Sequence, residues 1–325
     1  MTKTVPAGTT PMPRKKSTWQ VLKAQRYLQL FALAGIVYLL VFHYAPMFGI
    51  IIAFKKYRVT DGLMGFFTSP WVGLKYFKEF LSEHFFWLYL RNTLAMSVLK
   101  TVFTFPIPIL FALMLNELYN VRFKKFVQTV SYLPHFISWV VVSGMLFVFF
   151  STNGGVINEI LLSLGLIDKS LPFLFGPGYF WALAVVSDAW KEFGWWAIIF
   201  IAAIAGIDPA TYESAAIDGA GRMRRIWHIT LPGITGAISI VLILSLGNLL
   251  GGGISGSNFD QSFLLGNALN SDTSEIIATY VLKIGLGKAQ YSYATAVGVL
   301  QSLVSVMLLL GGNAAVKKIS GTGII

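Results

Sequence analysis

The sequence contains no cysteine, which excludes disulfides, a thiolate nucleophile and thiolate metal ligands. Its four histidines are scattered, and none forms the closely spaced pair typical of a zinc site on a helix. Charged residues make up only 12% of the chain, about half the share in a typical soluble domain. These shortages argue against a thiol enzyme, a histidine metalloenzyme and a soluble protein.

Apolar residues are abundant instead: they form 55% of the chain, and the mean hydropathy is +0.68. One soluble core cannot bury that surplus, so lipid must surround much of the surface. The 15% of aromatic residues suits belts at membrane interfaces. The net charge of +11 fits basic residues at cytoplasmic helix ends, and no nucleic-acid-binding motif interrupts the apolar segments. The composition predicts an all-α membrane protein that binds no nucleic acid.

Six apolar runs are each near or above the ~20 residues that a helix needs to cross a bilayer. They cover about Tyr27–Phe54, Phe85–Leu115, Phe126–Phe150, Phe180–Ile207, Pro232–Leu250 and Tyr293–Val316. The runs therefore predict about six transmembrane helices, with kinks at the internal prolines Pro46, Pro106, Pro108 and Pro134.

Lysine and arginine are more numerous in the segments that would be cytoplasmic if the N-terminus is inside. This bias predicts that both termini are cytoplasmic, although the first external segment, 55–84, is also basic. We expect a cytoplasmic tail over 1–26, a single transmembrane domain over 27–325 and external segments at 55–84 and 251–291. The first run is too long for a signal peptide, and no small-residue cleavage site follows it.

The cytoplasmic loop 208–230 carries local helix signals. Asp208 suits an N-cap, and Pro209 suits the first helical position. Gly219 and Gly221 are expected to end the helix in left-handed conformations, and a second short helix is expected over 222–228. These signals predict a helix–turn–helix elbow on the cytoplasmic face.

The residues of this elbow resemble the EAA motif of ABC-importer permeases. Glu213-Ser214-Ala215, then Gly219, then Ile229-x-Leu231-Pro232 keep the spacing of the motif, with Ser214 where the family usually has alanine. The resemblance implies a type I ABC importer permease fold, in which the elbow is a coupling helix in a groove of a separate ATPase subunit. The residues that the resemblance assigns to coupling are Tyr212, Glu213, Ser214, Ala215, Asp218, Gly219, Ile229, Leu231 and Pro232.

The residues around the motif resemble the maltose-transporter-like, carbohydrate branch of this family. Further segments resemble permeases for complex oligosaccharides: Ser69–Leu74, Asn92–Leu94, Ala112–Glu117 and Phe259–Gln261. The resemblance implies a second, homologous permease in a heterodimer, two ATPase subunits and an extracytoplasmic solute-binding protein, all at a bacterial cytoplasmic membrane. ATP and Mg²⁺ would bind the ATPase partner, and this chain, which has no P-loop motif, would hold no cofactor.

Polar residues within the apolar runs are candidates for a substrate pathway, because a charge inside a membrane usually faces a cavity or a partner. Asp188, Lys191 and Glu192 share one helical face, and the i, i+3 spacing predicts an Asp188–Lys191 pair. The other candidates are Asn92, Lys100, Trp190, Trp195 and Asn248. Two interpretations fit these residues. They could line a hydrophilic pathway in which the tryptophans stack on sugar rings, or they could form a local ion pair with aromatic residues at the membrane interface. The glycine pairs Gly247/Gly251 and Gly252/Gly256 fit either close helix packing or a broken helix end.

The sequence leaves the substrate charge and two other protein classes open. The basic residues favour an acidic oligosaccharide, whereas Asp188 and Glu192 favour a neutral one. A glycolipid-processing membrane enzyme would need two carboxylates that flank a bond, which an i, i+4 pair on one helix does not supply. A stand-alone channel or secondary transporter would leave the elbow unexplained, and no repeat is evident.

Overall fold

The structure is a computed structural model that describes residues 23–321, so most of the expected tail over 1–26 lies outside the described residues. Almost every ordered element is a helix; the described residues add one isolated β-bridge, between Lys55 and Trp71. The chain divides into two compact units, residues 1–51 and 52–325. The prediction of an all-helical protein is confirmed.

The first unit is an apolar helical stretch. Its elements are α2 (Arg26–Leu39), the π-helical turn η1 (Leu40–Tyr44) and α3 (Ala45–Met47), and η2 (Phe48–Phe54) leads into the second unit. None of the residues of α2 is buried within its own unit. A helix with so apolar a surface must be covered by lipid or by other protein surfaces.

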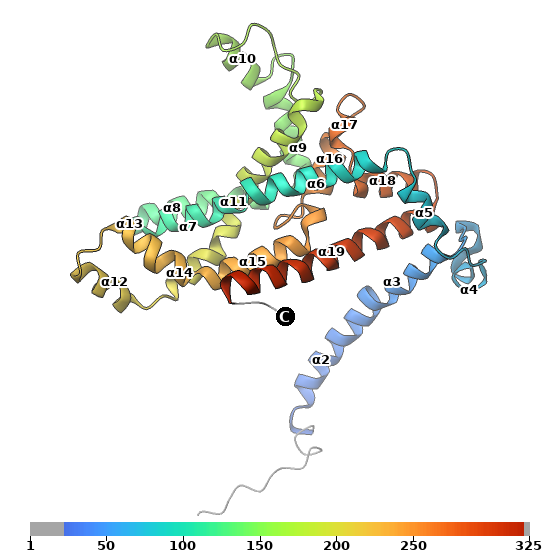
Figure 1. The fold of residues 1–325 in the computed structure, drawn as a ribbon, viewed down its shortest axis with the longest axis horizontal. Helices are drawn as coiled ribbons and strands as arrows, with labels where there is room; N and C mark the ends of the chain where they lie inside the picture. Colours follow the sequence, from blue (N-terminus) through green and yellow to red (C-terminus); the bar gives the residue numbers. More distant parts are fainter. Residues whose placement is uncertain (1–22, 322–325) are drawn as a thin grey trace, which may run out of the picture. The chain divides into compact units, whose positions relative to one another are not determined.

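The second unit contains all the remaining helices (Figure 1). Its first half comprises η3 (Val59–Met64), α4 (Gly65–Thr68), α5 (Lys75–Leu81), α6 (Phe86–Phe103), α7 (Pro106–Asn116), α8 (Val121–Tyr132), η4 (Leu133–Phe136), α9 (Trp139–Phe150), α10 (Val156–Ser163) and η5 (Pro177–Tyr179). Its second half comprises α11 (Phe180–Ala205), α12 (Pro209–Ile217), α13 (Arg222–Arg225), η6 (Ile226–Thr230), α14 (Leu231–Gly233), α15 (Thr235–Gly247), η7 (Leu249–Gly251), α16 (Asn258–Leu265), α17 (Ser271–Ser274), α18 (Ile277–Leu282), η8 (Lys283–Gly287) and α19 (Tyr291–Ser320).

Three helical stretches of the described chain are long and apolar enough to cross a membrane by themselves: Arg26–Phe54, Phe86–Asn116 and Tyr291–Lys318. Three bent helix pairs pass the same test only together: Val121–Phe136 with Trp139–Phe150, Pro177–Ala205 with Pro209–Ile217, and Arg222–Gly233 with Thr235–Gly247. They bend by 98°, 70° and 58°, respectively. The expected six spans are therefore reached if each bent pair is one span. The sharpest bend follows Pro134, one of the prolines expected to cause a kink.

Helix α11 lies at the centre of the second unit, with α6, α7 and α8 along it (Figure 1). Phe200 and Ile204 of α11 are buried in an apolar cluster with Ala112 and Leu113 of α7. Gly194 brings α11 very close to α8, because a Cβ at this position would overlap the Ser131 carbonyl oxygen. The charged residues of α11 are therefore held between tightly packed helices.

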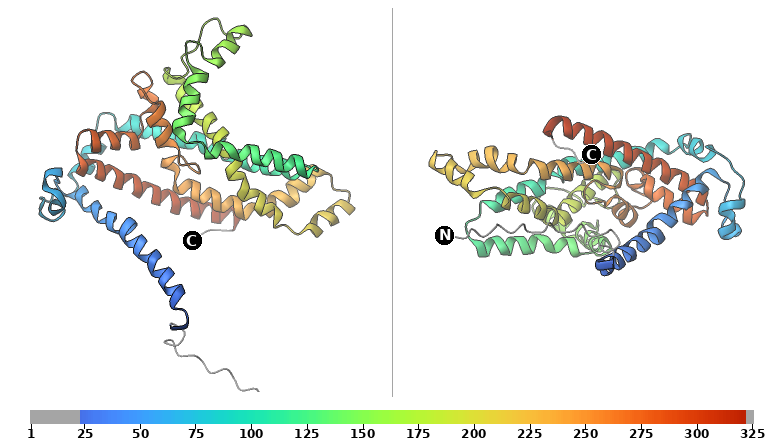
Figure 2. Two further views of the ribbon diagram at one scale, coloured as in Figure 1. Left: turned by 180° about the vertical axis from the view of Figure 1, so that it is seen from behind. Right: turned by 90° about the horizontal axis from the view of Figure 1, so that it is seen from below.

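Helices α15 and α19 lie side by side (Figures 1 and 2). Gly247 contacts Leu309, and a Cβ there would lie 2.6 Å from the leucine Cδ1. Beyond this point α15 ends, and Gly252, Gly253 and Gly256 adopt φ angles of +113°, +67° and +68°. Both interpretations of the glycines are thus realised, at different positions: close packing at Gly247 and a broken helix after it.

The expectation that 251–291 is wholly external is wrong for its first part. Ser257 and Asn258 are almost completely buried against α6, where Ser257 bonds Lys100 and Asn258 bonds Ser97. Lys100 lies near the middle of the membrane-crossing stretch Phe86–Asn116. The glycine-rich segment therefore returns into the bundle. Its composition is typical of an exposed loop, so the sequence did not predict this return.

Candidate functional site

The elbow, residues 208–230, forms as its local signals predict. The Asp208 carboxylate caps α12 by accepting a hydrogen bond from the Ala210 backbone N–H (3.0 Å), and Pro209 opens the helix. Helix α12 is turned by 70° from α11. Gly219 ends it with a φ of +74°, and the second short helix runs from Arg222 through Thr230.

One part of the elbow prediction is wrong. Gly221 has a φ of −65° and a ψ of 166°, so it is extended and caps α13 instead of adopting a left-handed conformation. The backbone reverses at Gly219 alone, where the Gly219 and Ala220 N–H groups return to carbonyls of α12. Within the elbow, Gly219 is therefore the position that requires glycine for its backbone conformation.

Two contacts connect the elbow to the membrane helices on either side. The Tyr212 hydroxyl lies 3.0 Å from the Thr230 hydroxyl, which joins α12 to the end of η6. At the base, Ile207 packs so closely on Gly233 that a Cβ there would lie 2.6 Å from the isoleucine Cδ1. Leu231 packs on the same apolar cluster as Ile207. The elbow is thus fixed to the ends of both α11 and α14.

The outer surface of α12 is exposed. The Glu213 carboxylate has no hydrogen-bond or ion-pair partner among residues 23–321. Ile217 is 87% exposed. Of the other predicted coupling residues, Ser214, Asp218 and Pro232 are exposed, whereas Ala215, Ile229 and Leu231 are half-buried. The acid Glu213 and the apolar Ile217, one helical turn apart, therefore both lie on the exposed side of α12.

A second group of polar residues is buried in the bundle, and we call Lys100, Asp188, Ser257, Asn258 and Gln261 the buried polar cluster. The Lys100 Nζ donates to the Ser257 hydroxyl (2.6 Å) and lies 3.9 Å from the Asp188 Oδ1. The Ser257 hydroxyl donates to the same carboxylate oxygen. The other oxygen of Asp188, the Asn258 Oδ1 and the Gln261 Oε1 have no hydrogen-bond partner in the described part of the chain. The cluster therefore keeps unused acceptors inside the membrane-spanning bundle.

The predicted Asp188–Lys191 pair is wrong. The Lys191 Nζ lies 2.8 Å from the Glu192 Oε1 and donates to the His135 carbonyl (2.8 Å). The Glu192 Oε2 lies 2.7 Å from the His135 Nδ1. Lys191 and Glu192 thus join α11 to η4, while Asp188 faces α6. Asp188 and Lys191 therefore contact residues of other helices instead of each other.

The remaining pathway candidates do not gather in one place. The Asn92 side chain is fully buried and donates to the Asp272 and Glu275 carbonyls, so its amide holds a backbone turn. Asn248 is exposed and donates to the Gly253 carbonyl. Trp190 lines an apolar groove of about 190 Å³ between α9 and α11, and Trp195 stacks on His135 with ring centres 4.3 Å apart.

Sequence reasoning missed His135 and Ser257. His135 follows Pro134, so its position beside a predicted kink was visible, but its partner Glu192 lies 57 residues further on. Ser257 had no signal, because a serine within a glycine-rich segment is typical of a turn. Both residues contact side chains that the sequence did single out: His135 contacts Glu192, and Ser257 contacts Lys100 and Asp188.

The apolar helices and the elbow that joins two of them define a helical membrane protein of the transport class. Residues 84–317 match the family described as "Binding-protein-dependent transport system inner membrane component". The chain belongs to this family. Its expected character as a transport permease subunit and inner-membrane component is thereby confirmed.

Two curated relatives from Bacillus subtilis (strain 168) match almost the whole chain. Protein LplB is 42% identical over 311 residues, covering 95% of each chain. The polygalacturonan/rhamnogalacturonan transport system permease protein YteP is 45% identical over 300 residues, covering 92% of this chain and 90% of its own.

A solved structure resembles this chain as well: a bacterial ABC transporter involved in the import of the acidic polysaccharide alginate. One of its chains is 37% identical, with a TM-score of 0.83, over 93% of this chain and 98% of that chain. A second structure shows the alginate transporter in complex with a periplasmic protein bound to an alginate pentasaccharide. Its matching chain has a TM-score of 0.84 at 37% identity over 94% of this chain and 99% of that chain.

Proposed function

We propose that this chain is the transmembrane permease subunit of an ATP-driven oligosaccharide importer and couples to a separate ATPase subunit through the elbow. The observation that carries the proposal is the exposed, unpaired Glu213 on α12, a helix fixed to the ends of two membrane helices. A motor that displaced α12 would therefore move those membrane helices. Rigid displacement of packed helices is a common way to switch between two states.

The proposal includes the arrangement in the membrane and the other subunits. The elbow and both termini lie on the cytoplasmic side of a bacterial membrane that the chain crosses six times. A second, homologous permease completes the pathway, two ATPase subunits bind ATP and Mg²⁺, and an extracytoplasmic binding protein delivers the oligosaccharide. The family's description as a binding-protein-dependent system and the binding protein in the alginate transporter structure support this assembly.

The substrate class that we propose is an acidic oligosaccharide. YteP is named for polygalacturonan and rhamnogalacturonan, and the similar solved transporter imports alginate, an acidic polysaccharide. Polygalacturonan is a polymer of a uronic acid, so both substrates carry carboxylates. In this chain the buried polar cluster supplies a cation, Lys100, that a substrate carboxylate would reach by replacing Asp188.

Copurification from mild detergent tests the proposal. A tagged chain should bring down a second permease and an ATPase, and ATP hydrolysis should rise when a binding protein loaded with oligogalacturonate is added. Maltotriose with its own binding protein is the neutral control. A chain that purifies without any ATPase would disprove the assignment, and stimulation by the neutral sugar alone would disprove the substrate class.

A further inference from the structure

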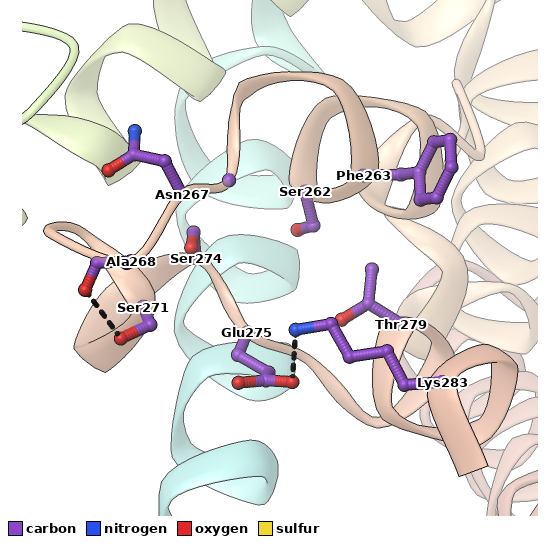
Figure 3. A pocket seen from close by; sticks show the side chains of 10 residues that line it. Ser262, Phe263, Asn267, Ala268, Ser271, Ser274, Glu275, Thr279 and Lys283 are labelled. Carbon is purple, nitrogen blue, oxygen red and sulfur yellow. Dashed lines mark hydrogen bonds and ion pairs between the residues drawn. The ribbon is translucent and has the colours of Figure 1, made fainter. Parts of the chain in front are cut away.

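A second polar site lies outside the elbow and the buried polar cluster. Helices α16, α17 and α18 enclose a pocket of about 350 Å³ (Figure 3). We call it the serine pocket, after Ser262, Ser271 and Ser274, which line it together with Glu275 and Lys283. Its volume lies at the lower end of the ~300–1,000 Å³ of small-molecule sites.

The wall of the serine pocket is fixed by two side-chain amides, one of them buried. Asn270, which is 1% exposed, donates to the Leu174 carbonyl (2.9 Å) and the Leu265 carbonyl (3.0 Å). The Asn267 amide also donates to Leu174 (3.0 Å). Gly266 completes the turn, where a Cβ would overlap the Ser262 carbonyl oxygen. The pocket is thus formed before any ligand arrives, which limits the ordering that binding requires.

Three polar groups remain available in the pocket. Ser274 is 3% exposed, yet its hydroxyl has no hydrogen-bond partner in the described chain. The Lys283 Nζ lies 2.6 Å from the Glu275 Oε1, an ion pair drawn across the pocket in Figure 3. An ammonium group has three N–H donors and a carboxylate several acceptor positions, so this pair retains unused capacity. An unpaired hydroxyl that lines a pocket can donate to and accept from a ligand or water.

An aromatic surface adjoins these polar groups. Phe263 lines the pocket and is 56% exposed. It stacks on Phe259 with ring centres 5.6 Å apart and an angle of 10° between the rings. A pyranose ring has C–H groups on one face and hydroxyls at its edge. The flat aromatic side chain can therefore contact the C–H face of a sugar, and the neighbouring hydroxyl, carboxylate and ammonium groups can bond its hydroxyls.

The serine pocket and the elbow lie at opposite ends of one membrane-crossing stretch. Near the start of Phe86–Asn116, Asn92 donates to the carbonyl of Glu275, a residue of the pocket (2.9 Å). Beyond the end of this stretch, Tyr119 accepts a hydrogen bond from Arg222 of the elbow (2.7 Å). If the elbow is cytoplasmic, the pocket faces the other side of the membrane.

We propose that the serine pocket binds one or two sugar units of the oligosaccharide on the extracytoplasmic side, before translocation. This inference rests on the proposed function, which supplies the side of the membrane and the substrate class. The Ser274 hydroxyl, Glu275 and Lys283 hold the sugar hydroxyls, and the ring lies on Phe263. The site adds a contact for the oligosaccharide at the surface, separate from the buried polar cluster.

The test uses the complete importer in lipid nanodiscs without binding protein. Binding of free trigalacturonate is measured by saturation-transfer NMR and by titration. Ser274→Ala removes one hydrogen bond and should weaken binding roughly fivefold, which corresponds to about 1 kcal/mol. Lys283→Ala should weaken it at least as much, and Ala268→Trp, which fills the pocket from an exposed position, should abolish it. Ser163→Ala and Lys288→Ala, both at exposed positions outside the pocket, are the matched controls.

Several results would overturn the inference. Unchanged trigalacturonate binding in all three pocket variants, or no binding by the wild-type importer, excludes a sugar site here. A separate measurement adds the unloaded binding protein to the same nanodiscs; its weaker association with the pocket variants, with sugar binding unchanged, would show that the pocket holds a protein segment instead. Failure of the proposed function looks different: the wild-type chain itself would then recruit no ATPase and show no stimulation by loaded binding protein.

Discussion

Lys100 and Asp188 face each other from α6 and α11, with 3.9 Å between the Nζ and Oδ1 atoms and the Ser257 hydroxyl bonded to both. Both side chains are 1% exposed. Each charge therefore has its main compensation in the other, since a buried charge without a partner is strongly unfavourable.

Replacing Lys100 by methionine should destabilise the protein, by about 3–5 kcal/mol, because Asp188 would be left as an uncompensated buried charge. The thermal unfolding midpoint of the purified complex measures this effect. Adding Asp188→Leu should recover much of the loss, and Lys125→Met, at an exposed lysine of α8, should change little. Normal stability of the Lys100 variant would contradict this mutual compensation, and lost uptake at normal stability would leave only the proposed contact of Lys100 with a substrate carboxylate.

Glu213→Ala should uncouple the importer. The carboxylate has no hydrogen-bond or ion-pair partner in the described chain, so its removal should leave insertion and folding unchanged while lowering uptake at least tenfold. Uptake and ATP hydrolysis are compared in vesicles that contain equal amounts of assembled complex. Glu159→Ala, at an exposed glutamate of α10, should retain wild-type uptake. Full uptake by the Glu213 variant would remove this residue from the coupling role.

Gly219 and Gly221 offer a matched pair of substitutions. Gly219→Ala forces a side chain into a left-handed backbone and should destabilise the elbow by about 1–2 kcal/mol, whereas Gly221→Ala should be tolerated at a φ of −65°. Neither glycine has another atom near the added Cβ, so backbone conformation alone separates them. Protease sensitivity of the elbow in the purified complex reports the difference. Equal sensitivity of both variants would contradict the assigned turn.

Gly194→Ala should separate α11 from α8, because its Cβ would overlap the Ser131 carbonyl oxygen. Overpacking of this kind typically lowers stability by about 1–3 kcal/mol. The measurement is the unfolding midpoint, with Gly144→Ala as the control, since nothing lies within 4 Å of a Cβ there. A midpoint equal to that of the control would mean that the two helices have room for a methyl group between them.

The parts of the fold that depend on neighbouring residues along the chain were predictable from the sequence. Asp208, Pro209 and Gly219 act within one or two turns of the backbone, so sequence patterns alone were enough to locate the elbow. The apolar runs likewise located the helices, since lipid selects them by length and composition.

The polar contacts were not predictable in the same way. Helical spacing favoured a pair between Asp188 and Lys191, but Asp188 bonds Ser257, which lies 69 residues away. A spacing rule describes one helix in isolation and cannot weigh a partner on another helix. The return of the segment around Ser257 into the bundle left no periodic pattern to detect.

The two attachments of the elbow have a mechanical consequence. Tyr212 joins α12 to Thr230, and Ile207 meets Gly233 at the base, so the segment between the two membrane helices forms a closed ring. A segment closed in this way cannot extend far before it moves the helices at its two ends. A force applied to α12 should therefore produce torque on α11 and α14 together, without first being absorbed by stretching of the connecting chain.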